Sequence, residues 1–491
     1  MLLSIVAIPA VLGAAAFFIS SRRLRRAMLL LGSGGHVAAV AVNAVRPAAV
    51  EPGAWVGLDA TGLLFLAVTS ILFAAVAVYT AGYLGRESGR IVNDAEEGFA
   101  FYNWPEAKFI GCLLLFLATM SLVCISRDLG LLWVAVEATT LVSAPLIGFH
   151  RHHRSLEATW KYLMICSVGI AMALLGNFFL AYAGHGQVHL NLDDLLSKAA
   201  GLDPLWLKAA FLMLLVGYGT KMGLAPMHTW LPDAHSEAPS MVSTLLSGTL
   251  LNCAFLGILR GNSVLNAAGL GTFSGELLVF FGLLSMSIAA VFIVGQVDYK
   301  RMLAYSSIEH MGILSLGVGL GGLSGVGAML HAACHSLTKG MLFLCAGQLL
   351  HVYGAKTAAD VRHALHSLPI TAFLWMAGFL AITGSPPFGL FISELTILKG
   401  ALESGRWAVA AGYLAALGII FIAMARVVLP MVFGSTREPA ATTGDASYAR
   451  EPRWFVIPAA SLGIGVVFLG LYMPPAIWDF LSRAAQLAGG R

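Results

Sequence analysis

The sequence predicts an all-α protein in which about fourteen helices cross a membrane. Two observations carry this prediction. The chain has 491 residues, of which 58% are hydrophobic and only 11% are charged, and its mean hydropathy is +0.83. A soluble globular domain carries roughly 25% charged residues, so this chain lacks the polar shell that would keep it in water. The second observation is that apolar runs recur along the whole chain.

These apolar runs are long enough to span a bilayer, which takes roughly 20 residues of helix. They fall at 1–20, 27–45, 60–84, 108–126, 129–149, 157–184, 205–222, 238–259, 274–295, 302–321, 324–349, 368–398, 407–433 and 454–480. The first run is followed rather than preceded by SRRLRR, so we expect an uncleaved first helix rather than a signal peptide. The segment 190–200, LNLDDLLSKAA, is amphipathic and too short to span, so we expect it at the membrane interface.

The basic residues of the short loops predict how the chain is oriented. Cytoplasmic loops carry an excess of lysine and arginine. With the N-terminus outside, most of the loop residues of this kind fall on the inner side, among them Arg22, Arg23, Arg25, Arg26, Arg86, Arg90, Lys108, Arg151, Arg154, Lys300, Arg301, Lys356, Arg362, Arg437, Arg450 and Arg453. We therefore predict that both termini lie outside.

Two of the spans contain residues that a helix does not tolerate. They are Thr220–Pro226 (TKMGLAP) and Thr383–Gly389 (TGSPPFG). A broken helix frees backbone amides and carbonyls, which persist in a membrane only inside protein or along a polar cavity. Paired breaks in two similar halves indicate inverted repeats with an ion pathway near mid-membrane. The alternative is that Gly and Pro are simply commoner in membrane helices.

The breaks suggest a division of the chain into four parts. We expect an N-terminal three-helix segment at 1–107 and a first repeat at 108–259. A second repeat follows at 274–433, and a C-terminal helix at 454–491. Each break lies near the end of its repeat.

Six ionisable side chains lie within or next to apolar spans. Each costs at least about 2.5–3.5 kcal/mol there, which makes it a functional candidate. They are Glu137, Lys221, His331, His335, Lys339 and Glu394. The residues at 331, 335 and 339 are spaced four apart. On a helix the side chains of the first and the last therefore point in directions that differ by only about 40°. The pKa of histidine lies near neutrality, and desolvation can lower the pKa of a lysine towards the same range. The stripe of side chains at 331, 335 and 339 therefore favours proton transfer.

Other interpretations of these residues remain open. Two histidines at i and i+4 can bind zinc, but no third ligand occurs at a matching spacing and Lys339 would repel a cation. We therefore predict no metal site. The six cysteines show no CxxC spacing, so neither a zinc nor an iron–sulfur site is expected, nor any other cofactor. Buried structural histidines and static ion pairs are the remaining alternatives.

Three motifs resemble a known family. They are KMGLAPMHTWLPDAHSEAPSMVSTLLSG (Lys221–Gly248), DYKRMLAYSSIEHMG (Asp298–Gly312) and HAACHSLTKGMLFLCAGQL (His331–Leu349). Together they resemble the antiporter-like subunits of respiratory complex I, of Mrp sodium/proton antiporters, and of energy-converting hydrogenases and formate hydrogenlyases. The resemblance covers about 100–440. Chain length, Asn252 and the absence of a long lateral helix favour the hydrogenase-4 component F-like branch, with complex I proper as the main alternative.

The resemblance implies both a fold and a set of working residues. The family has fourteen helices, with helices four to eight and nine to thirteen as inverted repeats and helices seven and twelve broken. Its functional positions on helices five, seven, eleven and twelve correspond to Glu137, Lys221, Lys339 and Glu394, with His331 and His335 along the central path.

One position departs from the family pattern. Asn252 stands where the complex I relatives usually carry a lysine. An amide can hold a water molecule in line but cannot store a proton. We therefore expect His228, His235 or a chain of waters to complete the relay.

The function implied by the resemblance is proton translocation by a non-redox subunit of an oxidoreductase complex in the cell inner membrane. We expect Glu137 and Lys221 to form a direct pair about 4 Å apart, which would hold a proton on the lysine. The expected partners are other membrane-arm subunits and a peripheral arm with iron–sulfur centres. A freestanding sodium/proton antiporter of the Mrp type and a passive membrane anchor are the alternatives. The net charge of +4 gives no reason to expect nucleic acid.

Overall fold

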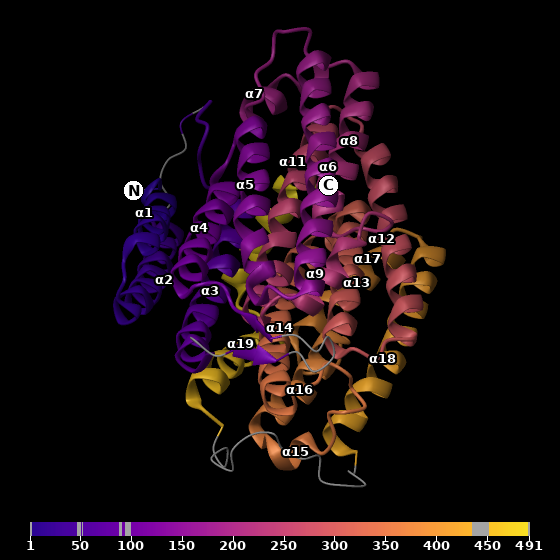
Figure 1. Cartoon of the computed structure of the whole chain (residues 1–491). Helices are drawn as coiled ribbons and strands as arrows, with labels where there is room; N and C mark the ends of the chain where they lie inside the picture. The colour runs from indigo at the N-terminus through magenta and orange to yellow at the C-terminus, as the bar shows by residue number, and fades with distance from the viewer. Residues whose placement is uncertain are drawn as a thin grey trace.

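The computed structural model describes residues 2–46, 51, 53–87, 91–93, 100–434 and 451–489. Within these ranges the chain is a bundle of long, roughly aligned helices (Figure 1). Ten helices are long and apolar enough to cross a membrane. The fold therefore confirms a polytopic all-α membrane protein.

The described helices group into fourteen successive crossing units, as predicted. They are α1 (Ser4–Phe18), α2 (Arg22–Val45), α3 (Ala60–Glu87), α4 (Glu106–Ile125), α5 (Leu129–Ile147), α6 (His153–Ala183), α8 with α9 (Pro204–Met222, Trp230–Glu237), α10 with η3 and α11 (Ser240–Leu245, Leu246–Leu250, Leu251–Ala267), α12 (Gly271–Val294), α13 (Tyr299–Leu320), α14 (Gly322–Tyr353), α16 with α17 (Pro369–Ile382, Gly389–Glu403), α18 (Trp407–Phe433) and α19 (Arg453–Leu471).

Short elements connect the crossing units. The predicted interfacial segment contains the helix α7 (Leu192–Ser197), which is capped by the Asn191 side chain. The others are η1 (Gly148–His150), η2 (Ala199–Gly201), α15 (Ala364–Ser367), α20 (Pro475–Leu487) and the antiparallel strands β1 (Ile91–Asn93) and β2 (Ala100–Tyr102). In Figure 1, α7 and α15 lie at opposite ends of the bundle.

Several predicted boundaries were wrong, and two of these errors have a clear physical cause. The last run, 454–480, is not one helix, because α19 ends at Leu471 and α20 begins at Pro475. Pro474 and Pro475 lack backbone donors and can only start a new helix. The second helix begins at Arg22 rather than at residue 27, and Ser21 accepts a hydrogen bond from the Leu24 amide as its N-cap. The basic segment is therefore the first turn of α2 and not a loop.

The two runs of five units share local features. The second unit of each run starts with an aspartate N-cap, Asp128 for α5 and Asp298 for α13. Each aspartate also forms an isolated β-bridge, with Asn191 and Thr357 respectively. The fourth unit of each run is broken. These correspondences agree with the predicted pair of five-helix repeats.

The first break lies where Gly and Pro predicted it. α8 ends at Met222, and Gly223 follows in the left-handed region with φ 83°. The freed backbone groups find partners: the Ala225 amide donates to Ser285 Oγ, and the Trp230 indole donates to the Thr220 carbonyl. Protein groups therefore replace the missing helical hydrogen bonds, as burial in a membrane requires.

The second break also lies in the predicted segment. α16 ends at Ile382 and α17 begins at Gly389. Gly384 between them has a φ of 64°, a conformation that side chains with a Cβ rarely adopt.

The helices that carry the candidate residues form the centre of the bundle. The unit from Ser240 to Ala267 is completely buried over its apolar window, whereas the corresponding share is 39% for both α6 and α18. Almost every residue of α14 between Ser324 and Leu349 is buried. Polar side chains on α11 and α14 are therefore shielded from lipid by the outer helices.

Candidate functional site

Lys221 lies on the last turn of α8, immediately before the first break, and is fully buried. Its ammonium group donates hydrogen bonds to Thr140 Oγ1 at 2.7 Å and to the Tyr162 hydroxyl at 2.6 Å. The Tyr162 hydroxyl is in turn 2.6 Å from Ser143 Oγ. A buried charge is thus surrounded by hydroxyl groups, which solvate it and can relay protons.

Glu137 lies on α5 and is only partly buried. Its carboxylate accepts hydrogen bonds from Thr140 Oγ1 at 3.3 Å and from Ser167 Oγ at 3.1 Å. The predicted direct pair with Lys221 was wrong: the described contacts join the two charges through the Thr140 hydroxyl. Thr140 follows Glu137 by three residues, so both side chains lie on one helix face and the hydroxyl stands between the charges.

Asn252 connects the first repeat to the central helix. Its amide donates to Ser336 Oγ on α14 at 2.8 Å and to the Gly248 carbonyl at 3.0 Å. The amide oxygen is buried without a hydrogen-bond partner in the described part of the chain. An unpaired buried acceptor is a place where a water molecule would be stabilised.

A π-helical turn, η3, lies just before Asn252. Single π turns occur frequently at functional sites. On this turn Ser247 Oγ lies 2.8 Å from Ser307 Oγ of α13. The polar contacts of this unit therefore reach α13 from η3 and α14 from α11.

Lys339 is fully buried near the middle of α14. It donates hydrogen bonds to the Leu303 carbonyl at 2.6 Å and to Ser306 Oγ at 2.8 Å, both on α13. Glu309, one turn further along α13, interacts electrostatically with this lysine. One oxygen of the Glu309 carboxylate has no hydrogen-bond partner among the described residues.

The histidines of α14 form a cluster with a third histidine from α13. His310 Nδ1 lies 2.9 Å from His331 Nε2. The rings of His331 and His335 are parallel, with centroids 6.5 Å apart, and the His335 ring lies 4.9 Å from that of His310. Three histidines are therefore in close contact although only two are neighbours in sequence.

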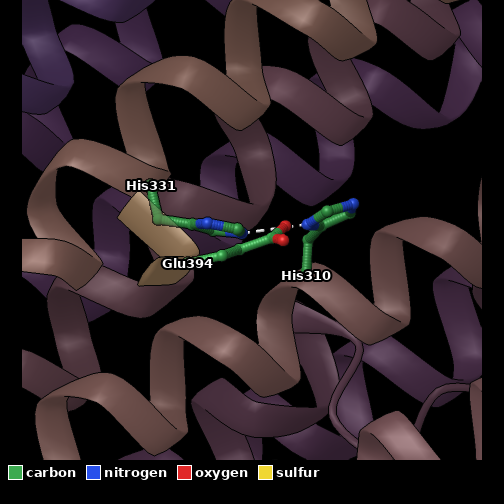
Figure 2. Close-up of side chains that lie close together, drawn as sticks. All are labelled: His310, His331 and Glu394. Carbon is green, nitrogen blue, oxygen red and sulfur yellow. Dashed lines mark hydrogen bonds between the residues drawn. The ribbon is translucent and has the colours of Figure 1, made fainter. Parts of the chain in front are cut away.

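Glu394 of α17 reaches the same cluster and is buried. Ligand atoms of His310, His331 and Glu394 all lie within 4.8 Å of one another. Figure 2 shows the three side chains converging on one point from different helices. The structure thus brings together His331 and Glu394, which lie 63 positions apart in the chain.

The two further histidines proposed for the relay lie in different surroundings. His235 on α9 is fully buried and stacks on Phe343 at 5.0 Å. Lys339 and Lys300 both interact electrostatically with it. His228, in the first break, instead contacts the rings of Phe292 and Tyr305, each at 6.4 Å. Both histidines therefore lie against aromatic rings, and His235 in addition interacts with two buried lysines.

The sequence reasoning missed several residues of this site. Glu309 and His310 lie in a buried span and in a motif that was used only for the resemblance. Their ionisable side chains within an apolar span could have identified both as candidates from the sequence alone. Thr140, Tyr162 and Ser336 carry neutral hydroxyls, which membrane helices often contain. No sequence signal separates those three from other hydroxyl residues.

The fold and the buried groups define a class of protein: a polytopic, antiporter-like membrane subunit with ionisable side chains along its interior. Residues 126–421 match the family described as NADH:quinone oxidoreductase/Mrp antiporter, transmembrane. The chain belongs to this family.

Curated relatives support the assignment over most of the chain. A hydrogenase-4 component F homolog from Methylacidiphilum infernorum is 34% identical over 89% of each chain. The NADH-quinone oxidoreductase subunit N of Desulforudis audaxviator is 31% identical over 84% of this chain and 80% of its own. Hydrogenase-4 component B of Escherichia coli is 29% identical over 69% of this chain and 49% of its own length.

Solved structures share the fold. A chain of the archaeal membrane-bound sulfane sulfur reductase superposes with a TM-score of 0.86, at 20% identity over 99% of this chain and 97% of its own. A chain of the Dietzia sp. Mrp complex gives a TM-score of 0.82, at 20% identity over 99% of this chain and 96% of its own. A chain of respiratory complex I from Thermus thermophilus gives 0.77, at 24% identity over 96% of this chain and 97% of its own.

Proposed function

We propose that this protein translocates protons as the antiporter-like membrane subunit of a redox-driven complex of the hydrogenase-4 or NADH-quinone oxidoreductase type. The observation that carries the proposal is the buried Lys221, which is joined to Glu137 through the Thr140 hydroxyl. A charge in such a place costs several kcal/mol, and a fold retains it where it acts.

The proposed route has two halves, which coincide with the repeats at 108–259 and 274–433. Glu137 and Lys221 load the proton in the first half. Asn252 and a bound water pass it towards Lys339, and His235, which interacts electrostatically with that lysine, forms a side branch. His331, His335 and Glu394 form the remaining part of the route in the second half. His228, which lies in the first break beside Phe292 and Tyr305, takes only a peripheral place in this scheme.

Lys339 provides the decisive test. In the assembled complex in membrane vesicles, Lys339→Ala is expected to abolish redox-driven proton uptake, because Lys339 is the ionisable group of α14 that bonds directly to Leu303 and Ser306 of α13. Lys339→Arg is not expected to rescue transport, since arginine does not release its proton near neutral pH. The matched control is Lys198→Ala, because Lys198 is an exposed lysine beside α7.

The amount of assembled complex must be measured in the same vesicles. Normal uptake by Lys339→Ala at equal assembly would contradict the proposal. Loss of assembly in both Lys339 variants would instead indicate a structural role for the lysine, and would equally contradict it.

We infer that the redox chemistry resides in partner subunits. The described bundle consists of membrane helices and short connections, which leaves the electron carriers to a peripheral arm with iron–sulfur centres. Purification of the chain from its native membrane is expected to recover other membrane-arm subunits and that arm. Recovery of the chain alone, active as a sodium/proton exchanger in liposomes, would favour a freestanding antiporter instead.

We also propose the plasma membrane as its location, with both termini outside. Arg90, Arg437 and Arg450, which support this orientation, lie outside the described residues, and the side chain of Arg86 is likewise not described. Labelling of single cysteines introduced into α7 and α15 tests it. Cysteines in α7 are expected to react with an impermeant reagent in intact cells, and those in α15 only after permeabilisation.

A further inference from the structure

The cluster of His310, His331 and Glu394, which includes two residues of the proposed proton route, also has the composition of a metal-ligand set. The three residues come from three helices, α13, α14 and α17, and all are buried. Two imidazoles and one carboxylate are a donor set found in mononuclear zinc sites and in sites for other divalent transition metals. The sequence alone suggested only the i, i+4 pair on α14, whereas the structure supplies the further ligands from neighbouring helices.

The tautomer of His331 can be deduced from its neighbours. Ser393 Oγ donates its proton to the Leu390 carbonyl at 2.8 Å, so it can only accept from His331 Nδ1, which lies 2.9 Å away. His331 therefore carries its proton on Nδ1, and the Nε2 lone pair faces the cluster. A fixed tautomer of this kind, held by a second hydrogen bond, is typical of metal-ligating histidines.

The electrostatics of Glu394 also favour a cation. Its carboxylate is buried and one of its oxygens has no hydrogen-bond partner in the described chain. No lysine or arginine of the described residues forms an ion pair with it. Glu309, a second buried carboxylate, interacts electrostatically with it. A divalent ion between the histidines and Glu394 would be neutralised by these two carboxylates.

The other polar groups near the cluster include one cation, Lys339, which opposes a bound ion. Lys339 acts on His310 and His335 electrostatically, but its ammonium is bound to the Leu303 carbonyl and Ser306 on α13. His335 contacts the His310 ring without a hydrogen bond to either ring nitrogen among the described residues. The Tyr413 hydroxyl, which also has no hydrogen-bond partner in the part of the chain that the structure describes, interacts electrostatically with both carboxylates.

The geometry requires a small adjustment. His310 Nδ1 and His331 Nε2 are 2.9 Å apart and share a hydrogen bond. Two nitrogen ligands of a tetrahedral zinc ion, each about 2.0–2.1 Å from the metal, are about 3.3–3.4 Å apart. The rings must therefore separate by about 0.4 Å, and the proton of His310 must move from Nδ1 to Nε2, after which the Nδ1 lone pair of His310 and the Nε2 lone pair of His331 both face the ion.

We propose that His310, His331 and Glu394 bind a divalent transition metal ion such as Zn²⁺, and that the bound ion closes the second half of the proton route. The ion would link α17, which follows the second break, to α13 and α14. It would also occupy the histidine and carboxylate lone pairs to which a proton would otherwise bind. Mg²⁺ and Ca²⁺, which prefer oxygen ligands, are not expected to compete for the site, because two of its ligands are imidazoles. The inhibitory part of this proposal rests on the proposed function, whereas the binding part does not.

The binding experiment uses the full-length protein in detergent, purified without a polyhistidine tag. Co²⁺ serves as the probe, because a four-coordinate cobalt site with nitrogen ligands gives intense visible absorption. We expect about one Co²⁺ per chain, displaced by Zn²⁺ and not by excess Mg²⁺. The spectrum is expected to be lost, with at least about tenfold weaker binding, in His331→Gln and in Glu394→Gln.

Two control variants separate this site from other histidines. His363 and His366 form an exposed, stacked pair that could bind metal on the surface. The double variant His363→Gln, His366→Gln is expected to keep the cobalt spectrum. His335→Gln, which alters the cluster but not its ligands, is expected to keep it as well. A spectrum that survives His331→Gln, or that disappears with the surface pair, would overturn the site.

The functional experiment measures redox-driven proton uptake by the assembled complex with and without Zn²⁺. We expect micromolar Zn²⁺ to inhibit the wild-type complex and a chelator to restore uptake. Ser393→Ala removes the hydrogen bond that keeps the proton of His331 on Nδ1, and it is expected to weaken inhibition by Zn²⁺. Binding without inhibition would support the site and count against the proposed route. Failure of the wild-type protein to bind cobalt would overturn this inference while leaving the proposed function unaffected.

Discussion

At the scale of single residues, hydroxyl groups hold the charges of this protein in place. Thr140 accepts from Lys221 and donates to Glu137, so one side chain sets the relation between two charges. A direct pair would bind the proton on the lysine more tightly, because Coulomb attraction rises as the charges approach. The intervening hydroxyl weakens that attraction and supplies a path between the charges.

Thr140→Val tests the bridge directly. The substitution keeps the shape of the side chain and removes the hydroxyl. Hydrogen bonds to charged groups are worth about 1.5–3 kcal/mol, so we expect proton uptake to fall at least about tenfold at equal assembly. Thr139→Val is the matched control, since Thr139 is equally buried and donates only to the Val136 carbonyl of its own helix. Equal uptake by the two variants would show that the bridge is dispensable.

At the scale of elements, the irregular turns lie beside the polar contacts. The π turn η3 precedes Asn252 and the two breaks lie beside Lys221 and Glu394. A regular helix satisfies most of its own backbone groups, whereas a break or a π turn frees some of them to bond to side chains. The irregular turns therefore add to the hydrogen bonds that the buried hydroxyl and amide side chains make.

Asn252→Leu tests the element that joins the repeats. Leucine has a similar size but cannot bond to Ser336 or hold a water, so we expect proton uptake to fall at least about tenfold. Asn43→Leu is the control, because Asn43 is just as buried and donates only to the Ala39 carbonyl of its own helix. Uptake is compared in vesicles with equal amounts of complex. A harmless Asn252→Leu would place the route elsewhere.

Gly384→Ala tests the second break. An added methyl group would overlap the Glu394 carboxylate, and the left-handed backbone at this position costs a non-glycine residue about 1–2 kcal/mol. We expect a lower unfolding temperature in detergent and loss of proton uptake. In the control, Gly418→Ala on α18, the methyl group meets no neighbouring atom within 4 Å. Gly418→Ala should therefore unfold no earlier than the wild type, and equal stability of both variants would refute the argument.

At the scale of the whole molecule, one buried ion network joins distant parts of the chain. Asp59 lies before α3 and accepts from Arg260 of α11 at 2.5 Å. Arg127, before α5, lies 3.7 Å from the same carboxylate and also pairs with Asp193 of α7. The network therefore ties the N-terminal segment to the first repeat at one end of the bundle.

Arg260→Met is expected to destabilise the whole bundle. Removing one partner of a buried pair costs about 3–5 kcal/mol, and the lower end applies here because Arg127 remains near Asp59. Arg406→Met removes an exposed pair with Glu276 instead and is expected to cost about 0–1 kcal/mol. Thermal unfolding in one detergent compares the two variants. Similar unfolding temperatures would show that the buried network contributes little.

The sequence by itself determined the class of fold, the positions of both breaks and the membership of Lys221, Lys339 and Glu394 in the interior. Composition and periodicity are local properties, and a charge within an apolar span is visible without coordinates. Only the tertiary structure decided which groups meet. Thr140 stands between Glu137 and Lys221, and His310 joins His331 and Glu394 from another helix, because helix packing sets contacts between residues far apart in sequence.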